Sequence, residues 1–203
     1  MVKSIGIVGD SIAHGFFDEE ESGWVSRLAK LILKDYPGEY VFNNLSQSGD
    51  NIADAANRAV FEVLSRHFDL IIVNIGINDL RRRKNSNLEL DFSEGARIMY
   101  WQKLLDTLSL TRATIVITDL LPIVEGKYSV EANLIRRTSD IIRYNEIISE
   151  ICKERRIHFF AQSQKWQTRN TEELYQDATH PNAKGHQLIA EDLYTYLKEQ
   201  NLL

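Results

Sequence analysis

Short apolar runs alternate with longer amphipathic stretches along the whole chain, and this alternation limits the folds open to it. The runs have the length of buried strands and cover residues 5–8, 40–43, 70–75, 114–118 and 157–160. Apolar residues recur at helical spacing over residues 24–33, 52–64, 92–110, 133–154 and 186–197. Repeated strand–helix alternation predicts an α/β sandwich with a mostly parallel sheet. The near-continuous apolar strands indicate that helices cover both faces of that sheet.

The composition is that of a globular protein with one core. Hydrophobic residues make up 43% and charged residues 26% of the 203 residues, and no linker, repeat or low-complexity tract divides them. We therefore expect a single domain over residues 1–203. The net charge of −5 argues against nucleic acid as a partner. Cys152 is the one cysteine, so no internal disulfide can form, and we expect a packed, unreactive thiol.

The N-terminal residues bear on where the protein acts. Residues 1–4 lead directly into the first predicted strand, with no apolar segment of the kind found in signal peptides. No apolar stretch reaches transmembrane length. We therefore expect a cytoplasmic protein without a membrane span. The sequence contains no evident coiled-coil heptad or large apolar stripe, so it does not indicate an oligomeric state.

Four polar clusters follow predicted strands. Asp10-Ser11 follows the first strand, residues 46–50 follow the second, and residues 76–79 follow the third. Residues 177–180 lie between the fifth strand and the last predicted helix. In open parallel sheets, ligands bind beyond the carboxyl ends of the strands. The sequence therefore predicts one site at this edge.

Ser11, His180 and Asp177 are the residue types that hydroxyl-based acyl transfer needs. An imidazole can take the proton of a serine hydroxyl, and a carboxylate can hold that imidazole in the required tautomer. His180 has Asp177 three residues away in the same predicted loop, which none of the other four histidines has. Taken alone, Ser11 suits a helix N-cap equally well.

Gly49 and Asn78 are candidates for a second task at the same edge. Attack on a carbonyl produces an oxyanion, which needs preorganised hydrogen-bond donors. The N–H of Gly49, the side-chain amide of Asn78 and the N–H of Ser11 could supply them, although both loops also read as ordinary turns. Metal-ligand spacings are absent from the sequence, so we expect no metal and no cofactor.

These motifs together resemble the SGNH (GDSL-type) hydrolase family. The resemblance lies in Gly9-Asp10-Ser11, Gly49, Gly76-x-Asn78-Asp79 and Asp177-x-x-His180, in that order along nearly the whole chain. It implies a flavodoxin-like, three-layer α/β/α sandwich with a five-stranded, mostly parallel sheet. It also implies serine-dependent hydrolysis of carboxylic esters without a cofactor.

Roles for individual residues follow from the same resemblance. Ser11 would be the nucleophile, His180 the general base and then acid, and Asp177 the residue that orients His180. The N–H groups of Ser11 and Gly49 and the amide of Asn78 would form the oxyanion hole. Asp10 and Asp79 would shape their loops rather than react.

The substrate is expected to be a small-molecule ester with a short or medium acyl group. The same machinery would serve a carbohydrate O-acetyl esterase, a thioesterase or a lysophospholipase. A non-enzymatic alternative is a flavodoxin-like binding or signalling module, in which Asp10 and Asp79 resemble the acidic residues of phospho-accepting domains.

Several flanking segments allow two interpretations. Residues 120–124 and Phe16-Phe17 either line an acyl pocket or simply pack against neighbours. Residues 81–84, Arg-Arg-Arg-Lys, either steer an anionic substrate or form a solvated turn. Arg136-Arg137 is expected to lie on the surface of the predicted helix over residues 133–154.

Overall fold

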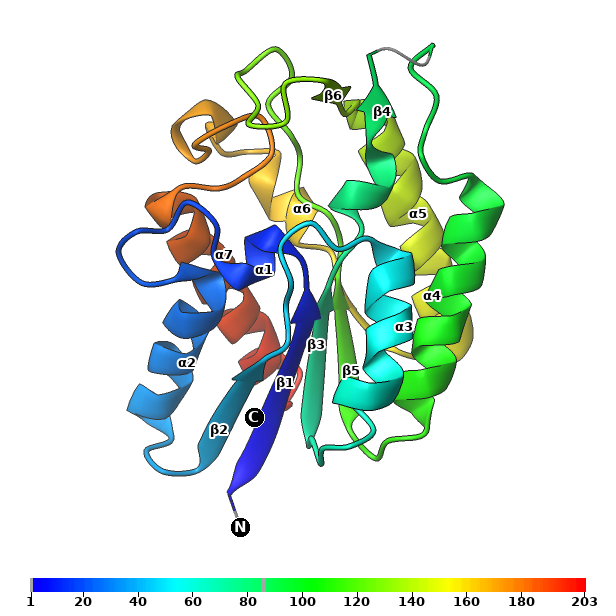
Figure 1. Cartoon of the computed structure of the whole chain (residues 1–203). Helices are drawn as coiled ribbons and strands as arrows, with labels where there is room; N and C mark the ends of the chain where they lie inside the picture. Colours follow the sequence, from blue (N-terminus) through cyan, green and yellow to red (C-terminus); the bar gives the residue numbers. More distant parts are fainter. Residues whose placement is uncertain (1, 85–86) are drawn as a thin grey trace.

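A parallel sheet of five strands forms the centre of the molecule. The computed structural model describes residues 2–84 and 87–203. The strand order is β2-β1-β3-β5-β7, and all four neighbouring pairs are parallel (Figure 1). This order, 2-1-3-4-5 when only these strands are counted, is that of flavodoxin-like folds. The strands are β1 Lys3–Gly9, β2 Tyr40–Asn44, β3 Leu70–Asn74, β5 Thr114–Thr118 and β7 His158–Phe160.

Helices cover both faces of the sheet and complete three layers. In Figure 1, α2 and α7 lie together on one side, and α3, α4 and α5 lie on the other. The longer helices are α2 Gly23–Asp35, α3 Ile52–Glu62, α4 Glu94–Ser109, α5 Thr138–Arg155 and α7 Ala183–Glu199. The short ones are α1 Ser11–His14, α6 Gln162–Trp166 and the 3₁₀ turns η1 Ile77–Leu80 and η2 Thr171–Glu173. The predicted fold class is confirmed.

Burial of apolar strands explains why the sheet forms where it does. Every residue of β3 is buried, as are the last five residues of β1. Fully burying one Ile or Val side chain contributes about 1.5–3 kcal/mol. The loop after β2 ends in a capping box, in which the side chain of Asn51 accepts hydrogen bonds from the N–H groups of Ala53 and Asp54. The carboxylate of Asp54 accepts the N–H of Asn51 in return, which fixes the start of α3.

The predicted helix over residues 133–154 is wrong at its N-terminal end. Helix α5 begins at Thr138, because β6 Leu134–Ile135 pairs antiparallel with β4 Arg82–Arg83. The N–H of Thr138 donates to the carboxylate of Glu125, 13 residues earlier in the chain, which satisfies one donor of the first helical turn. Arg136 and Arg137 therefore precede the helix.

Two further properties of the chain concern membranes and the cysteine. In the part of the chain that the structure describes, no helix combines the length and the apolar character needed to cross a bilayer. Cys152 lies buried on α5, and its burial raises the pKa of the thiol to about 12. The thiol is therefore protonated at neutral pH, as expected for a packed cysteine.

Candidate active site

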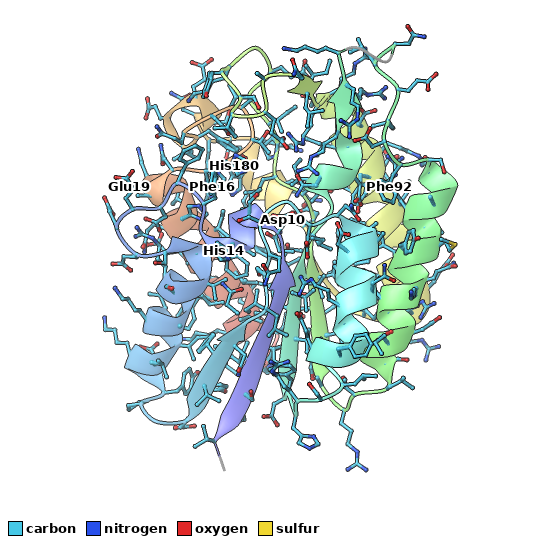
Figure 2. All side chains as sticks on the ribbon, viewed as in Figure 1. Asp10, His14, Phe16, Glu19, Phe92 and His180 are labelled. Atoms are coloured by element: carbon cyan, nitrogen blue, oxygen red, sulfur yellow. The ribbon has the colours of Figure 1, made fainter. Side chains whose placement is uncertain are left out.

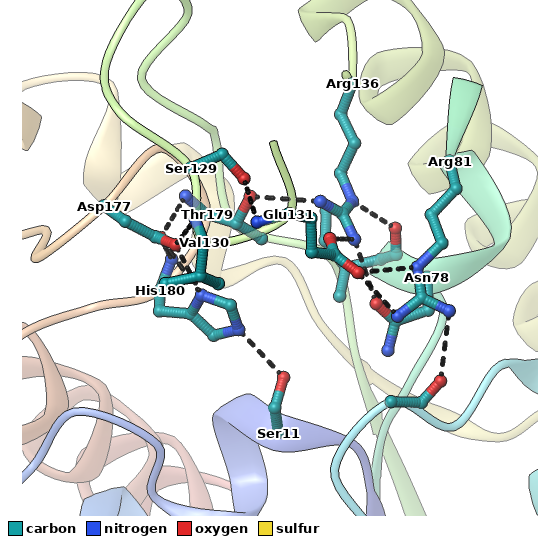
Figure 3. A network of polar contacts seen from close by, with 12 residues as sticks. Ser11, Asn78, Arg81, Ser129, Val130, Glu131, Arg136, Asp177, Thr179 and His180 are labelled. Atoms are coloured by element: carbon teal, nitrogen blue, oxygen red, sulfur yellow. Dashed lines mark hydrogen bonds and ion pairs between the residues drawn. The ribbon is translucent and has the colours of Figure 1, made fainter. Parts of the chain in front are cut away.

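Ser11 is the first residue of the short helix that follows β1. Asp10 caps this helix, and its carboxylate accepts the N–H of Ile12 at 2.9 Å. Position 9, just before Asp10, requires glycine, because a Cβ on Gly9 would lie 2.5 Å from the Cβ of Ala13. The sharp passage from strand to helix places the buried Ser11 side chain at the carboxyl edge of the sheet (Figure 3).

Ser11, His180 and Asp177 form a continuous chain of polar contacts (Figure 3). The Oγ of Ser11 lies 3.0 Å from Nε2 of His180, and Nδ1 of His180 lies 3.0 and 3.1 Å from the two carboxylate oxygens of Asp177. All three side chains are buried. A carboxylate beside Nδ1 favours the tautomer with the proton on Nδ1, which leaves Nε2 free to accept the proton of Ser11. The three predicted residues are therefore brought together.

Asp177 is held as a carboxylate. Burial by itself would raise its pKa, but hydrogen bonds from the ring of His180 and from the N–H groups of His180 and Thr179 lower the pKa to about 2. The N–H of Val130 also donates to Oδ2 of Asp177, at 3.3 Å. Because four donors converge on this group, it is ionised and fixed in orientation at neutral pH.

The candidate oxyanion donors lie after β1 (Ser11), in the loop after β2 (Gly49) and in η1 after β3 (Asn78). The Nδ2 group of Asn78 donates one hydrogen to the carbonyl of Asp50 at 2.8 Å, which leaves the second hydrogen. Gly49 adopts a φ of +91°, and a Cβ there would meet no atom within 4 Å, so its surroundings are open. Among the described residues, no acceptor binds the N–H of Ser11 or of Gly49. Figure 3 shows Asn78 across the site from Ser11 and His180.

Asp79 is buried and ties three elements together. Its carboxylate accepts the N–H of Ile52 at 2.8 Å and the hydroxyl of Tyr144 at 2.5 Å. Burial raises the pKa of Asp79 to about 6 and that of Asp10 to about 7. Both carboxyl groups face the interior, which suits residues that shape loops and leaves neither exposed to a phosphodonor.

Two phenylalanine rings pack against the histidine of the site. The rings of Phe16 and Phe17 lie 5.0 and 5.7 Å from the ring of His180. Figure 2 shows Phe16 beside His180. Phe17 has a φ of +66°, a conformation that bulky residues rarely adopt. Phe16 is 40% exposed and lines a groove of about 570 Å³. The other residues that line the groove are His14, Gly15, Phe17, Asp18, Ser22, Ser26, Asn44, Ser46 and Gln47.

Residues 120–124 pack beneath the site. Leu120, Leu121, Ile12 and Ile77 line a cavity of only about 10 Å³, room for about one water-sized group. Val124 is buried, and its N–H donates to the carbonyl of Ala178. Ile123 and Val124 also line a separate, open hollow of about 590 Å³, together with Arg136, Ala178 and Thr179. The packing interpretation therefore fits Leu120 and Leu121, and the pocket interpretation fits residues 123–124.

The basic residues 81–84 all have polar partners, and the first two are half-buried. Arg81 pairs with Glu131 and Arg82 with Asp140, and both arginines are half-buried. Arg83 and Lys84 are exposed and bind Asp91 and the carbonyl of Ala132, respectively. The solvated turn is therefore wrong for the first two residues.

Arg136 is the residue of this region that the sequence pattern misplaces. It is 9% exposed instead of lying on a helix surface. Its guanidinium donates to the carbonyl of Ile77, to Oγ1 of Thr179 and to Oδ1 of Asn78, at 2.9, 3.3 and 3.0 Å. The available signal was a pair of arginines at the boundary of a helical period, which does not by itself indicate burial.

A further question is whether side chains of the site could bind a metal ion. In residues 2–84 and 87–203, no group of three or more His, Cys, Asp or Glu side chains could hold a metal ion. The site consists of a hydroxyl, a base, a carboxylate and nearby amide donors. Such a set can transfer an acyl group through the hydroxyl.

Comparison with known proteins identifies the class of protein that this fold and site define. The sequence matches the GDSL-like Lipase/Acylhydrolase family over residues 7–188. The chain belongs to this family and is an ester-hydrolysing serine hydrolase.

Individual relatives are similar over nearly their whole length. An acetylxylan esterase of Geobacillus stearothermophilus is 27% identical, with 90% of this chain and 88% of that protein covered. The crystal structure of the acetyl xylan esterase AlAXEase has a TM-score of 0.78 at 19% identity and covers 96% of this chain and 99% of its own. A lipase/acylhydrolase from Enterococcus faecalis has a TM-score of 0.76 at 18% identity, with 98% and 97% covered. The two structures show the shared fold.

Proposed function

We propose that this protein hydrolyses carboxylic esters through Ser11 as nucleophile, His180 as general base and acid, and Asp177 as the residue that orients His180. The observation that carries the proposal is the buried chain of contacts from Ser11 to His180 to Asp177. The ionised state of Asp177 supports it, because a carboxylate stabilises the imidazolium that forms during the reaction.

The reaction proceeds in two acyl-transfer steps. The Oγ of Ser11 bonds to the ester carbonyl carbon while its proton moves to Nε2 of His180, and the carbonyl oxygen becomes an oxyanion. The ester C–O bond then breaks, and His180 gives its proton to the leaving alcohol. Water next attacks the acyl-enzyme with His180 as base, which releases the carboxylic acid and restores Ser11.

The oxyanion is assigned to three donors. They are the N–H groups of Ser11 and Gly49 and the remaining Nδ2 hydrogen of Asn78. Their free state supports this assignment, because a donor that is already bonded to protein would have to break that bond during the reaction.

For the substrate, we propose an acetyl or other short acyl ester carried on a carbohydrate. The acetylxylan esterase relative supports this class. The groove beside Phe16 offers an aromatic face together with hydroxyl and amide groups, a mixture that suits a sugar ring. The single domain over residues 1–203 and the cytoplasmic location both stay predictions.

The first experiment joins labelling with turnover. Wild type and Ser11→Ala are treated with a serine-directed phosphonate probe and assayed on p-nitrophenyl acetate, butyrate and octanoate. Ser65→Ala, on an exposed serine far along the chain, is the control. We expect loss of labelling and turnover in Ser11→Ala alone. Turnover that survives in Ser11→Ala would mean that another residue is the nucleophile.

A second assay tests the substrate class. Acetylated xylo-oligosaccharides, an acyl thioester and a lysophospholipid are compared as substrates of the wild-type enzyme. We expect the highest kcat/KM on the acetylated sugar and a steep loss between acetyl and octanoyl esters. A preference for the thioester or for the lysophospholipid would replace the carbohydrate proposal and leave the Ser11 mechanism intact.

A further inference from the structure

We propose that Arg136 is a positioning residue that holds the amide of Asn78 with its free Nδ2 hydrogen toward the reacting carbonyl. The inference rests on the proposed function, in which Asn78 is an oxyanion donor. It adds a residue that lies outside all four polar clusters at the strand ends. Figure 3 shows Arg136 in contact with Asn78, across the site from Ser11.

The contacts on Asn78 permit only one orientation of its amide. Nη2 of Arg136 donates to Oδ1 at 3.0 Å, while Nδ2 donates to the carbonyl of Asp50 at 2.8 Å. If the amide turned over, Nδ2 would face the guanidinium, and Oδ1 would face the carbonyl of Asp50. Two donors would then meet on one side and two acceptors on the other. Arg136 therefore determines which atom of Asn78 faces the site.

The guanidinium shape matters as well as the charge. Three nitrogens of Arg136 bind three separate acceptors, namely the carbonyl of Ile77, Oγ1 of Thr179 and Oδ1 of Asn78. A planar fork can serve all three at once, whereas the single ammonium of a lysine is a point donor at the end of a flexible stem. Lysine at this position would keep the charge and lose part of the alignment.

A counter-charge makes the burial of Arg136 tolerable. The carboxylate of Glu131 lies 2.7 Å from Nη2 of Arg136, and its other oxygen lies 2.9 Å from Arg81. Burial would raise the pKa of Glu131, but the charges of Arg136 and Arg81 outweigh it and lower that pKa. Arg81 in turn donates to the carbonyl of Gly49 at 3.3 Å. One network of charges thus connects the loops that carry Gly49 and Asn78.

The segment before α5 also reaches the other half of the site. Arg136 contacts Thr179, which lies between Asp177 and His180 in the sequence, and the N–H of Val130 contacts Asp177 itself. Because these contacts fix groups that react only after substrate has bound, their loss should act on turnover more than on binding.

The test compares Arg136→Met and Arg136→Lys with wild type on p-nitrophenyl acetate. The matched control is Arg82→Met. Arg82 lies on the neighbouring strand β4 and makes a bidentate pair with Asp140 of α5. We expect kcat to fall about 10–100-fold in Arg136→Met, since a hydrogen bond to a charged group is lost, with KM changed less than about twofold. Arg82→Met should keep kcat within about threefold of wild type.

A double-mutant cycle separates positioning from a general structural effect. If Arg136 acts through Asn78, then Arg136→Met should lower kcat by no more than about threefold in an Asn78→Ala background. Full additivity of the two changes would overturn the proposal. A raised KM with unchanged kcat would also overturn it, since that result indicates direct binding of substrate.

A second variant keeps the test decisive if Arg136→Met does not fold. If Arg136→Met unfolds, Arg136→Lys retains the charge and serves alone, with an expected drop in kcat of at least about fivefold. Wild-type kcat in a folded Arg136→Lys protein would overturn the proposal. Failure of the proposed function is a separate result, because the wild-type protein would then show no labelling at Ser11 and no effect of Asn78→Ala.

Discussion

Asp10 should make the stability of this protein fall as the pH rises. Burial raises the pKa of its carboxyl to about 7 in the folded state, against 3.8 for the free side chain. Between these two values the folded protein keeps a proton that the unfolded chain has released. The free energy of unfolding therefore decreases with increasing pH through this window, by up to about 1.4 kcal/mol per pH unit.

Asp10→Asn removes this dependence with little change in shape. An asparagine Oδ1 can still accept the N–H of Ile12, so the cap of α1 is kept. With folded and unfolded pKa values of about 7 and 3.8, the wild type loses about 2.5 kcal/mol relative to the variant between pH 5 and pH 8. The variant should therefore gain on the wild type as the pH rises.

Urea unfolding followed by tryptophan fluorescence measures this difference, since all three tryptophans are buried. Asp18→Asn is the control, because the pKa of Asp18 is shifted downwards in the folded protein, whereas that of Asp10 is shifted upwards. Burial would raise the pKa of Asp18, but its bonds to Arg27 and to backbone N–H groups lower it to about 2, so it stays ionised above pH 5. Its substitution should cost the same at pH 5 and pH 8. If the Asp10→Asn difference is flat or shrinks with pH, Asp10 is ionised in the folded protein and the reasoning is refuted.

Three further substitutions test the site and its support. Asn78→Ala should lower kcat on p-nitrophenyl acetate by about 10²–10³ in a protein that still folds, and a near-normal rate would remove Asn78 from the oxyanion hole. Tyr144→Phe leaves Asp79 and Nε1 of Trp101 without the hydroxyl that joins them, and should cost about 1–3 kcal/mol in urea unfolding. Gly76→Ala, at a φ of +130° and with a Cβ 2.3 Å from the Tyr144 hydroxyl, should lower the melting temperature more than Tyr144→Phe does.

Much of the fold and the grouping of site residues could be predicted because both follow from local pattern and sheet topology. Apolar runs such as Leu70–Asn74 indicate strands, and parallel strands present their carboxyl ends at one edge. Residues as distant as Ser11 and His180, 169 positions apart, are thereby expected to meet, and they lie in hydrogen-bond contact. The catalytic roles of these residues stay a prediction until the variants are measured.

The pattern fails where a residue's environment is set by partners far along the chain. Arg136 reads as helix surface by its spacing, yet its three acceptors lie 59, 43 and 58 residues away. Periodicity describes which residues share a face of one helix, and it carries no information on tertiary partners. The short β4–β6 pair, which keeps residues 134–135 out of the helix that begins at Thr138, could not be predicted from the sequence for the same reason.

The segment over residues 129–136 has a consequence for how the site can change. Asp177 and Asn78 lie in different loops, yet both are held from this one segment, through Val130 on Asp177 and Arg136 on Asn78. Interfaces and packed networks shift between discrete arrangements more readily than they deform by small degrees. A substitution in this segment can therefore displace two sets of reacting groups at once, although it touches none of the motif residues. Rates in this protein should accordingly respond to substitutions in residues 129–136 as well as to substitutions in the loops that carry the motifs.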